Sequence, residues 1–138
     1  VNVVAPGPVE TDMTAALGEK RIGEIVGAVP LGRMATADEI AEELTGSILK
    51  DLSLKPGQEV ILLVNGFGGT PLLELYVMVH AARKVLAGAG VKVARFLTGS
   101  YVTSLEMAGC SITVSAADSA TLALWDAPVH TAALRWGV

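Results

Sequence analysis

A glycine-rich segment at residues 65–71, Asn-Gly-Phe-Gly-Gly-Thr-Pro, is the first place where this sequence could bind a ligand. It follows an apolar run and precedes a predicted helix, with Thr70 as the N-cap and Pro71 as the first helical residue. Backbone N–H groups at a helix N-terminus attract anions such as phosphate. We therefore expect Gly68, Gly69 and Thr70 to be the donors if the loop binds a small anion. The alternative is a loop that only reverses the chain, because the segment lacks the lysine of a P-loop and the spacing of a dinucleotide fingerprint.

The other reactive side chains are scattered along the sequence. His80 falls inside a predicted helix and His130 in the C-terminal tail, and neither has another ligand at metal-binding spacing. We expect no metal site and interpret both histidines as surface residues. The single cysteine, Cys110, lacks a charged neighbour, which favours a buried and inert thiol. Ser104 has no histidine base near it in the sequence, so no nucleophilic triad is predicted.

Composition limits the classes of function. The chain has 138 residues, of which 51% are hydrophobic and 17% charged, as expected for one globular domain with a real core. Its formal net charge is −4, which offers no basic surface for nucleic acid or an anionic membrane. No apolar run approaches the roughly 18 residues of a membrane span. A lone cysteine fits a reducing compartment, so we expect a soluble, cytoplasmic protein.

The elements that would position the glycine loop predict an α/β fold. Residues 60–64 are five consecutive apolar residues, which is typical of a strand buried on both faces. Strands alternate with helices long enough for right-handed crossovers. We expect a three-layer α/β/α domain with a mostly parallel sheet, in which strand 60–64 is central and strands 91–97 and 3–5 are its neighbours.

Capping patterns predict where the helices begin. Thr36 and Glu39 have the spacing of a capping box, which opens a helix through about Lys50. Ser115, with Asp118 three residues later, predicts another helix start. The helix after Thr70 should bury one stripe of apolar residues, namely Leu72, Leu75, Val79, Ala82 and Leu86.

The stretch from Val1 to Glu39 resembles the C-terminal part of short-chain dehydrogenases/reductases of the ketoacyl-reductase type. The resemblance rests on Asn-Val-Val-Ala-Pro-Gly-Pro-Val-Glu-Thr-Asp-Met at residues 2–13 and Val-Pro-Leu-Gly-Arg-Met at residues 29–34. It implies that the residues touching the nicotinamide end of the cofactor are Pro6, Gly7, Val9 and Thr11. The family's glycine-rich cofactor loop and Tyr-x-x-x-Lys pair have no counterpart here. We therefore expect vestigial contacts, no cofactor, weak NADPH binding at best and no dehydrogenase activity.

From about Ala37 onward the sequence resembles the C-terminal end of the dihydroxyacetone-binding part of dihydroxyacetone kinases. The motifs that carry this resemblance are residues 51–57, 64–76, 103–109 and 125–128. In that family a histidine forms a covalent adduct with the ketone, within a His-Gly-Glu-Pro-Gly type segment that does not occur in this sequence. The resemblance also implies a possible homodimer.

Two resemblances in one chain suggest a junction near residues 36–42. We expect a single α/β domain over residues 1–138, with a dehydrogenase-like segment at 1–36 and a kinase-like segment at 37–138. The leading hypothesis is a chimeric or engineered scaffold without a complete active site. The alternative is a fragment or subunit of a dihydroxyacetone kinase that supplies its substrate-binding component. A further alternative is a module that binds phosphate or another anion through the glycine loop.

Overall fold

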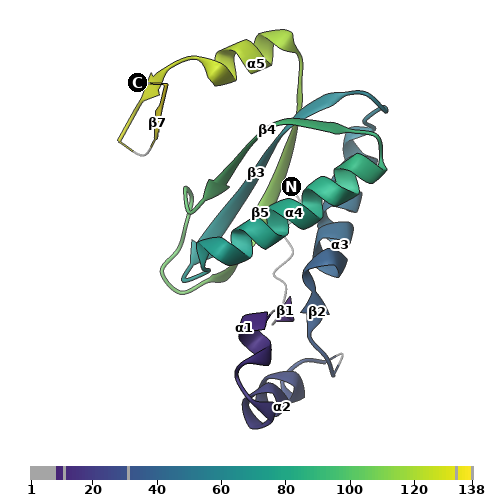
Figure 1. Cartoon of the computed structure of the whole chain (residues 1–138), viewed down its shortest axis with the longest axis vertical. Helices are drawn as coiled ribbons and strands as arrows, with labels where there is room; N and C mark the ends of the chain where they lie inside the picture. The colour runs from purple at the N-terminus through teal and green to yellow at the C-terminus, as the bar shows by residue number, and fades with distance from the viewer. Residues whose placement is uncertain (1–8, 11, 31, 133, 138) are drawn as a thin grey trace.

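The computed structural model describes residues 9–10, 12–30, 32–132 and 134–137, and it confirms the α/β fold class (Figure 1). In chain order its elements are β1 (Val9–Glu10), α1 (Asp12–Ala15), α2 (Glu19–Gly27), β2 (Ala35–Thr36), α3 (Ala37–Leu52), β3 (Glu59–Gly68), α4 (Leu72–Gly88), β4 (Lys92–Gly99), β5 (Ala108–Ala117), α5 (Ser119–Asp126), β6 (Val129–His130) and β7 (Arg135–Trp136).

A three-stranded sheet in the order β4-β3-β5 forms the centre of the structure. The prediction that residues 60–64 form the central strand is confirmed. β4 lies parallel to β3, whereas β5 is antiparallel to it, so the sheet is mixed rather than mostly parallel. The reason is the short connection at residues 100–107, because a parallel return would need a crossover of a dozen or more residues. The predicted neighbour strand at residues 3–5 lies outside the described residues.

The hydrophobic core lies between this sheet and α4. Side chains alternate along β3, and Val60, Leu62 and Val64 are completely buried on the face toward α4. Of their partners in β5, Val114 and Ile112 are buried on the same face, whereas Ala116 is exposed. From α4 the buried residues include Leu75, Val79, Ala82 and Leu86, as predicted. Leu72 does not join them, because it lies in the first turn and is 53% exposed.

Helix α3 packs beside α4 and begins with the predicted capping box. The Thr36 hydroxyl accepts a hydrogen bond from the Glu39 N–H at 3.2 Å, and the Glu39 carboxylate accepts one from the Thr36 N–H at 2.9 Å. Ile40 and Leu44 are buried against the core. Lys84 of α4 pairs with Asp38 of α3 at 3.2 Å. This exposed pair adds little stability, so the two helices are held together mainly by their apolar contacts.

Helix α5 follows β5 and lies beyond the end of the sheet where β5 finishes (Figure 1). Arg95 of β4 is aligned with Ile61, on the face turned away from α4, and its guanidinium pairs with Asp126 at 2.6 Å. No residue of α5 is buried.

The predicted helix start at Ser115 is wrong, because β5 continues to Ala117. Asp118 is the N-cap and accepts a hydrogen bond from the Thr121 N–H at 2.7 Å.

The two outer strands of the sheet differ in character. β4 carries Lys92 and Arg95, and its register with β3 is interrupted by an irregularity between Val60 and Ile61. β5 has no charged residue and no proline over its ten residues. Among the described residues, β5 pairs with β3 alone.

The first described residues join the core through a small parallel pair. Val9 of β1 pairs with Ala35 of β2, and both pack against the core cluster. Residues from both predicted segments thus contact one hydrophobic core. In the described part of the chain, none of the helices combines the length and hydrophobicity needed to cross a bilayer.

Candidate functional site

The predicted glycine loop at 65–71 is shorter in the structure, because β3 continues through Gly68 and the connection to α4 is residues 69–71. Two of its three expected donors already have partners within the protein. The Gly68 N–H donates to the Thr103 hydroxyl at 2.8 Å, and the Thr70 N–H donates to the Phe67 carbonyl at 3.1 Å. An anion bound by Gly68, Gly69 and Thr70 would have to replace these bonds. The anion site stays a prediction that this geometry does not favour.

Thr70 ties the loop to β5 instead of capping α4. Its hydroxyl lies 2.8 Å from the Phe67 carbonyl and 3.0 Å from the Gly109 carbonyl, and it accepts a hydrogen bond from the Gly109 N–H at 2.8 Å. The predicted N-cap role of Thr70 is therefore wrong. The N-cap is Pro71, which makes no side-chain cap bond.

Asn65 fastens a second loop to the same end of the sheet. Its side chain is 4% exposed. Its carbonyl oxygen accepts hydrogen bonds from the Tyr101 and Val102 N–H groups, both at 2.9 Å, and its amide donates to the Val102 carbonyl at 2.8 Å. No role of Asn65 was predicted from the sequence. Its position directly after five apolar strand residues could have indicated one, because a polar side chain that is buried there needs hydrogen-bond partners.

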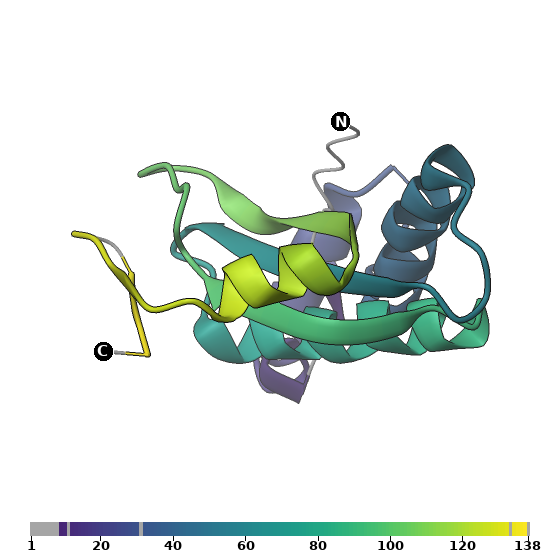
Figure 2. The same cartoon turned by 90° about the horizontal axis from the view of Figure 1, so that it is seen from above.

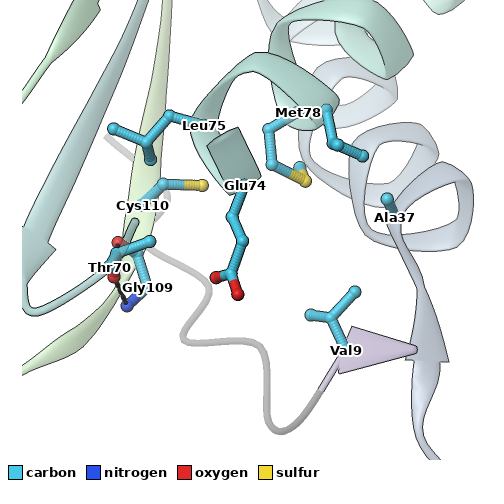
Figure 3. A pocket seen from close by; sticks show the side chains of 9 residues that line it. Val9, Ala37, Thr70, Glu74, Leu75, Met78, Gly109 and Cys110 are labelled. Carbon is cyan, nitrogen blue, oxygen red and sulfur yellow. Dashed lines mark hydrogen bonds between the residues drawn. The ribbon is translucent and has the colours of Figure 1, made fainter. Parts of the chain in front are cut away.

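A small pocket lies between the glycine loop, the start of α4 and β5 (Figure 3). Its volume is about 50 Å³, which is room for a few water molecules and not for a cofactor. The carboxylate of Glu74 points into it from α4, beside Thr70 and Gly109. Burial raises the pKa of the Cys110 thiol at its wall, so the thiol stays protonated. The prediction of a buried cysteine is confirmed.

A second, open groove of about 480 Å³ runs between α4 and β4. It is lined in part by His80, Lys84 and Phe96. The Arg83 guanidinium lies 5.7 Å from the centre of the Phe96 ring, within cation–π range. His80 and His130 are both exposed, as predicted. In the part of the chain that the structure describes, no three His, Cys, Asp or Glu side chains are grouped to hold a metal ion.

One of the four predicted cofactor contacts lies within the described residues. Val9 lies in β1 and lines the small pocket, where it faces Ala37 and Met78 rather than an open cofactor cleft. Pro6, Gly7 and Thr11 lie outside the described residues. The cofactor contacts at Pro6, Gly7, Val9 and Thr11 therefore stay a prediction, because Val9 is the one of the four that lies within the described residues.

Comparisons with known proteins identify relatives for most of the chain. The family model described as the Dak1 domain matches residues 27–133. Over 84 residues the chain is 52% identical to the dihydroxyacetone-binding subunit of the PEP-dependent dihydroxyacetone kinase of Escherichia coli (strain K12), covering 61% of this chain and 24% of the relative. Over 109 residues it is 38% identical to the triokinase/FMN cyclase of Homo sapiens, covering 75% of this chain and 19% of the relative.

A solved structure agrees with these relatives. The dihydroxyacetone kinase operon co-activator Dha-DhaQ superposes with a TM-score of 0.65 at 30% identity, covering 70% of this chain and 30% of that one. The chain spans about a quarter of the length of the Escherichia coli relative.

These findings correct the leading hypothesis from the sequence. The matched region begins at residue 27, inside the dehydrogenase-like segment, and runs without a break through the suggested junction at 36–42. The hypothesis of a chimeric or engineered scaffold is contradicted, and the dehydrogenase resemblance finds no support. A family model that covers residues 27–133 of 138 includes the whole central sheet and the helices packed on it. The chain belongs to the Dak1 domain family.

Proposed function

We propose that the chain is part of the substrate-binding component of a dihydroxyacetone kinase. The observation that carries this proposal is the 52% identity with the dihydroxyacetone-binding subunit of the Escherichia coli kinase over 84 residues. Identity at this level over 84 residues supports a shared local fold. The triokinase relative, which is also named for a kinase, supports the same class of reaction.

The described residues fit a positioning role at the end of the sheet where β3 and β4 finish. In α/β proteins, ligands bind outside the carboxyl ends of parallel strands, where loops meet. Here Asn65 holds the β4–β5 loop and Thr70 holds the glycine loop, through bonds of 2.8–3.0 Å. We assign these residues the task of fixing two loops that border the ketone site. We do not assign the covalent capture of the ketone to His80 or His130, because both are exposed.

A hybrid protein tests the proposal directly. In the dihydroxyacetone-binding subunit of the Escherichia coli kinase, the homologous stretch would be replaced by residues 37–126 of this chain. Isothermal titration calorimetry with dihydroxyacetone should then show binding close to that of the parent subunit, whereas glycerol, which lacks the carbonyl group, should not bind. The complete kinase containing the hybrid should consume phosphoenolpyruvate only when dihydroxyacetone is present.

A matched variant separates function from folding. The same hybrid with Asn65→Leu should keep its secondary structure by circular dichroism and bind dihydroxyacetone more weakly, because the β4–β5 loop is released. If the hybrid folds and the parent subunit binds the ketone under the same conditions, but the hybrid does not, the proposed function is wrong.

A further inference from the structure

The groove between α4 and β4 brings aromatic and basic side chains together. Tyr76, His80 and Arg83 follow one another at spacings of four and three residues, so they form one stripe along α4. Phe96 of β4 lies on the face of the sheet toward α4, because its partner in β3 is the buried Leu62. Helix α4 and strand β4 lie side by side in both views of the molecule (Figures 1 and 2). We call this feature the α4–β4 groove.

The α4–β4 groove has the size and the aromatic surface of a small-molecule site. Its volume of about 480 Å³ lies within the roughly 300–1,000 Å³ that is usual for ligand pockets. Tyr76 is 49% exposed and Phe96 is 38% exposed, so both rings are accessible from solvent. A planar ring that stacks on either of them would bury aromatic surface that the fold itself leaves exposed.

The charged side chains of the α4–β4 groove are positive. Among the described residues, those that line it include Arg83, Lys84 and the imidazole of His80, and none is a carboxylate. Lys84 pairs with Asp38 of α3, whereas in the described part of the chain Arg83 makes no ion pair. The Arg83 guanidinium lies 5.7 Å from the centre of the Phe96 ring. A guanidinium over a ring keeps its N–H donors available in its own plane, where they bind a phosphate or carboxylate in a bidentate way.

We infer that the α4–β4 groove binds a small molecule in which a planar ring is joined to a phosphate monoester, as in a mononucleotide. A phosphate monoester carries about two negative charges at neutral pH, which matches two cations better than a single carboxylate does. Arg83 and Lys84 hold the phosphate, and Tyr76 and Phe96 contact the ring. A nucleic-acid strand fits less well, because the formal net charge is −4 and a strand needs a longer row of basic residues.

This site is separate from the loops that the proposed function assigns to the ketone. Neither Asn65 nor Thr70 lines the α4–β4 groove. The inference therefore goes beyond the proposed function and does not rest on it.

Isothermal titration calorimetry of the full chain with three probes tests the inference. Adenosine 5′-monophosphate carries both the ring and the phosphate, and it should bind with a Kd below about 1 mM. Adenosine lacks the phosphate and ribose 5-phosphate lacks the planar ring. Each of these two should bind about tenfold more weakly or worse, because each loses one set of contacts.

Variants of exposed side chains show where the monophosphate binds. Arg83→Gln should weaken its binding about tenfold, because a charged hydrogen-bond donor to the phosphate is lost. Phe96→Leu keeps an apolar side chain and removes the ring, and it should weaken the binding of adenosine as well. The control is Arg135→Gln in β7, which makes the same chemical change away from α4 and should leave the affinity unchanged (Figure 1). Circular dichroism should show the same secondary structure for all three variants.

Four outcomes would overturn the inference. The first is that the monophosphate does not bind. The second is that adenosine or ribose 5-phosphate binds as tightly as the monophosphate. The third is that Arg83→Gln keeps full affinity or loses no more than Arg135→Gln. The fourth is that a short oligoadenylate binds much more tightly than the monophosphate, which would make a nucleic-acid strand the occupant. Dihydroxyacetone binding by the hybrid subunit does not use this groove, so each outcome leaves the proposed function standing.

Discussion

Replacing Asn65 by leucine should release the β4–β5 loop while keeping the branched shape of the buried side chain. The substitution removes three hydrogen bonds to Tyr101 and Val102, with lengths of 2.8–2.9 Å. A neutral hydrogen bond contributes about 1 kcal/mol net, so the three together contribute about 3 kcal/mol. A buried leucine returns about 2 kcal/mol through its apolar surface. We expect the free energy of unfolding to fall by about 1 kcal/mol, out of the roughly 5–15 kcal/mol available to a domain.

Urea denaturation followed by circular dichroism measures this loss, and hydrogen exchange shows where it arises. The Tyr101 and Val102 amides should exchange faster in Asn65→Leu, while the amides of α4 should exchange at rates set by global stability. Thr103→Val removes only the bond from the Gly68 N–H and should cost about 1 kcal/mol. If Asn65→Leu changes the unfolding free energy by less than about 0.5 kcal/mol, or leaves both amides protected, the assigned role of Asn65 is refuted.

Three further predictions follow from local geometry. Thr36→Ala should lower the free energy of unfolding by about 1 kcal/mol in urea denaturation, because α3 loses its capping box. The hydrogen bond with Arg33 lowers the pKa of Glu39 from 4.5 to about 2. The contribution of Glu39 to the stability of the fold should therefore be complete above about pH 4.5 and disappear as the pH falls toward 2. In thermal melts, Glu39→Gln should flatten this pH dependence. Gly68→Ala should destabilise the chain more than Gly69→Ala. Gly68 has φ +54°, and a Cβ added there would collide with the backbone of Met107, whereas no atom lies within 4 Å of a Cβ added at Gly69. Equal melting temperatures of the two variants would contradict this.

Patterns within one element predicted the fold well. The apolar run at 60–64 identified the central strand, and the spacing of Thr36 and Glu39 located the start of α3 to the residue. Both signals depend only on neighbours along the chain. The direction of β5 could be judged from the short connection at 100–107, but the pattern of Ser115 and Asp118 predicted the helix start three residues too early. Pairing with β3 extends β5 to Ala117, so the helix begins after Asp118.

The candidate site was harder to predict because its contacts join distant residues. Thr70 had the sequence of an N-cap, yet its hydroxyl bonds Gly109 from the neighbouring strand. Asn65 meets Tyr101 and Val102 only after β3 and β4 have paired. The hypothesis of a chimera rested on the resemblance of residues 1–39 to another family, whereas the family match extends across residues 27–133. Local motifs could not show that Val9 and Ala35 share the hydrophobic core with β3 and α4.

The contrast between the two outer strands has a consequence for handling this protein at high concentration. Charged side chains and irregular pairing discourage a strand edge from recruiting other chains, and β4 has Lys92, Arg95 and an interrupted register. β5 offers ten residues without charge or proline, so aggregation should begin at β5 when the chain is concentrated or partly unfolded. Thr113→Lys, at an exposed position in the middle of β5, should delay turbidity on heating. A lysine added to β4, which is already protected, should have little effect.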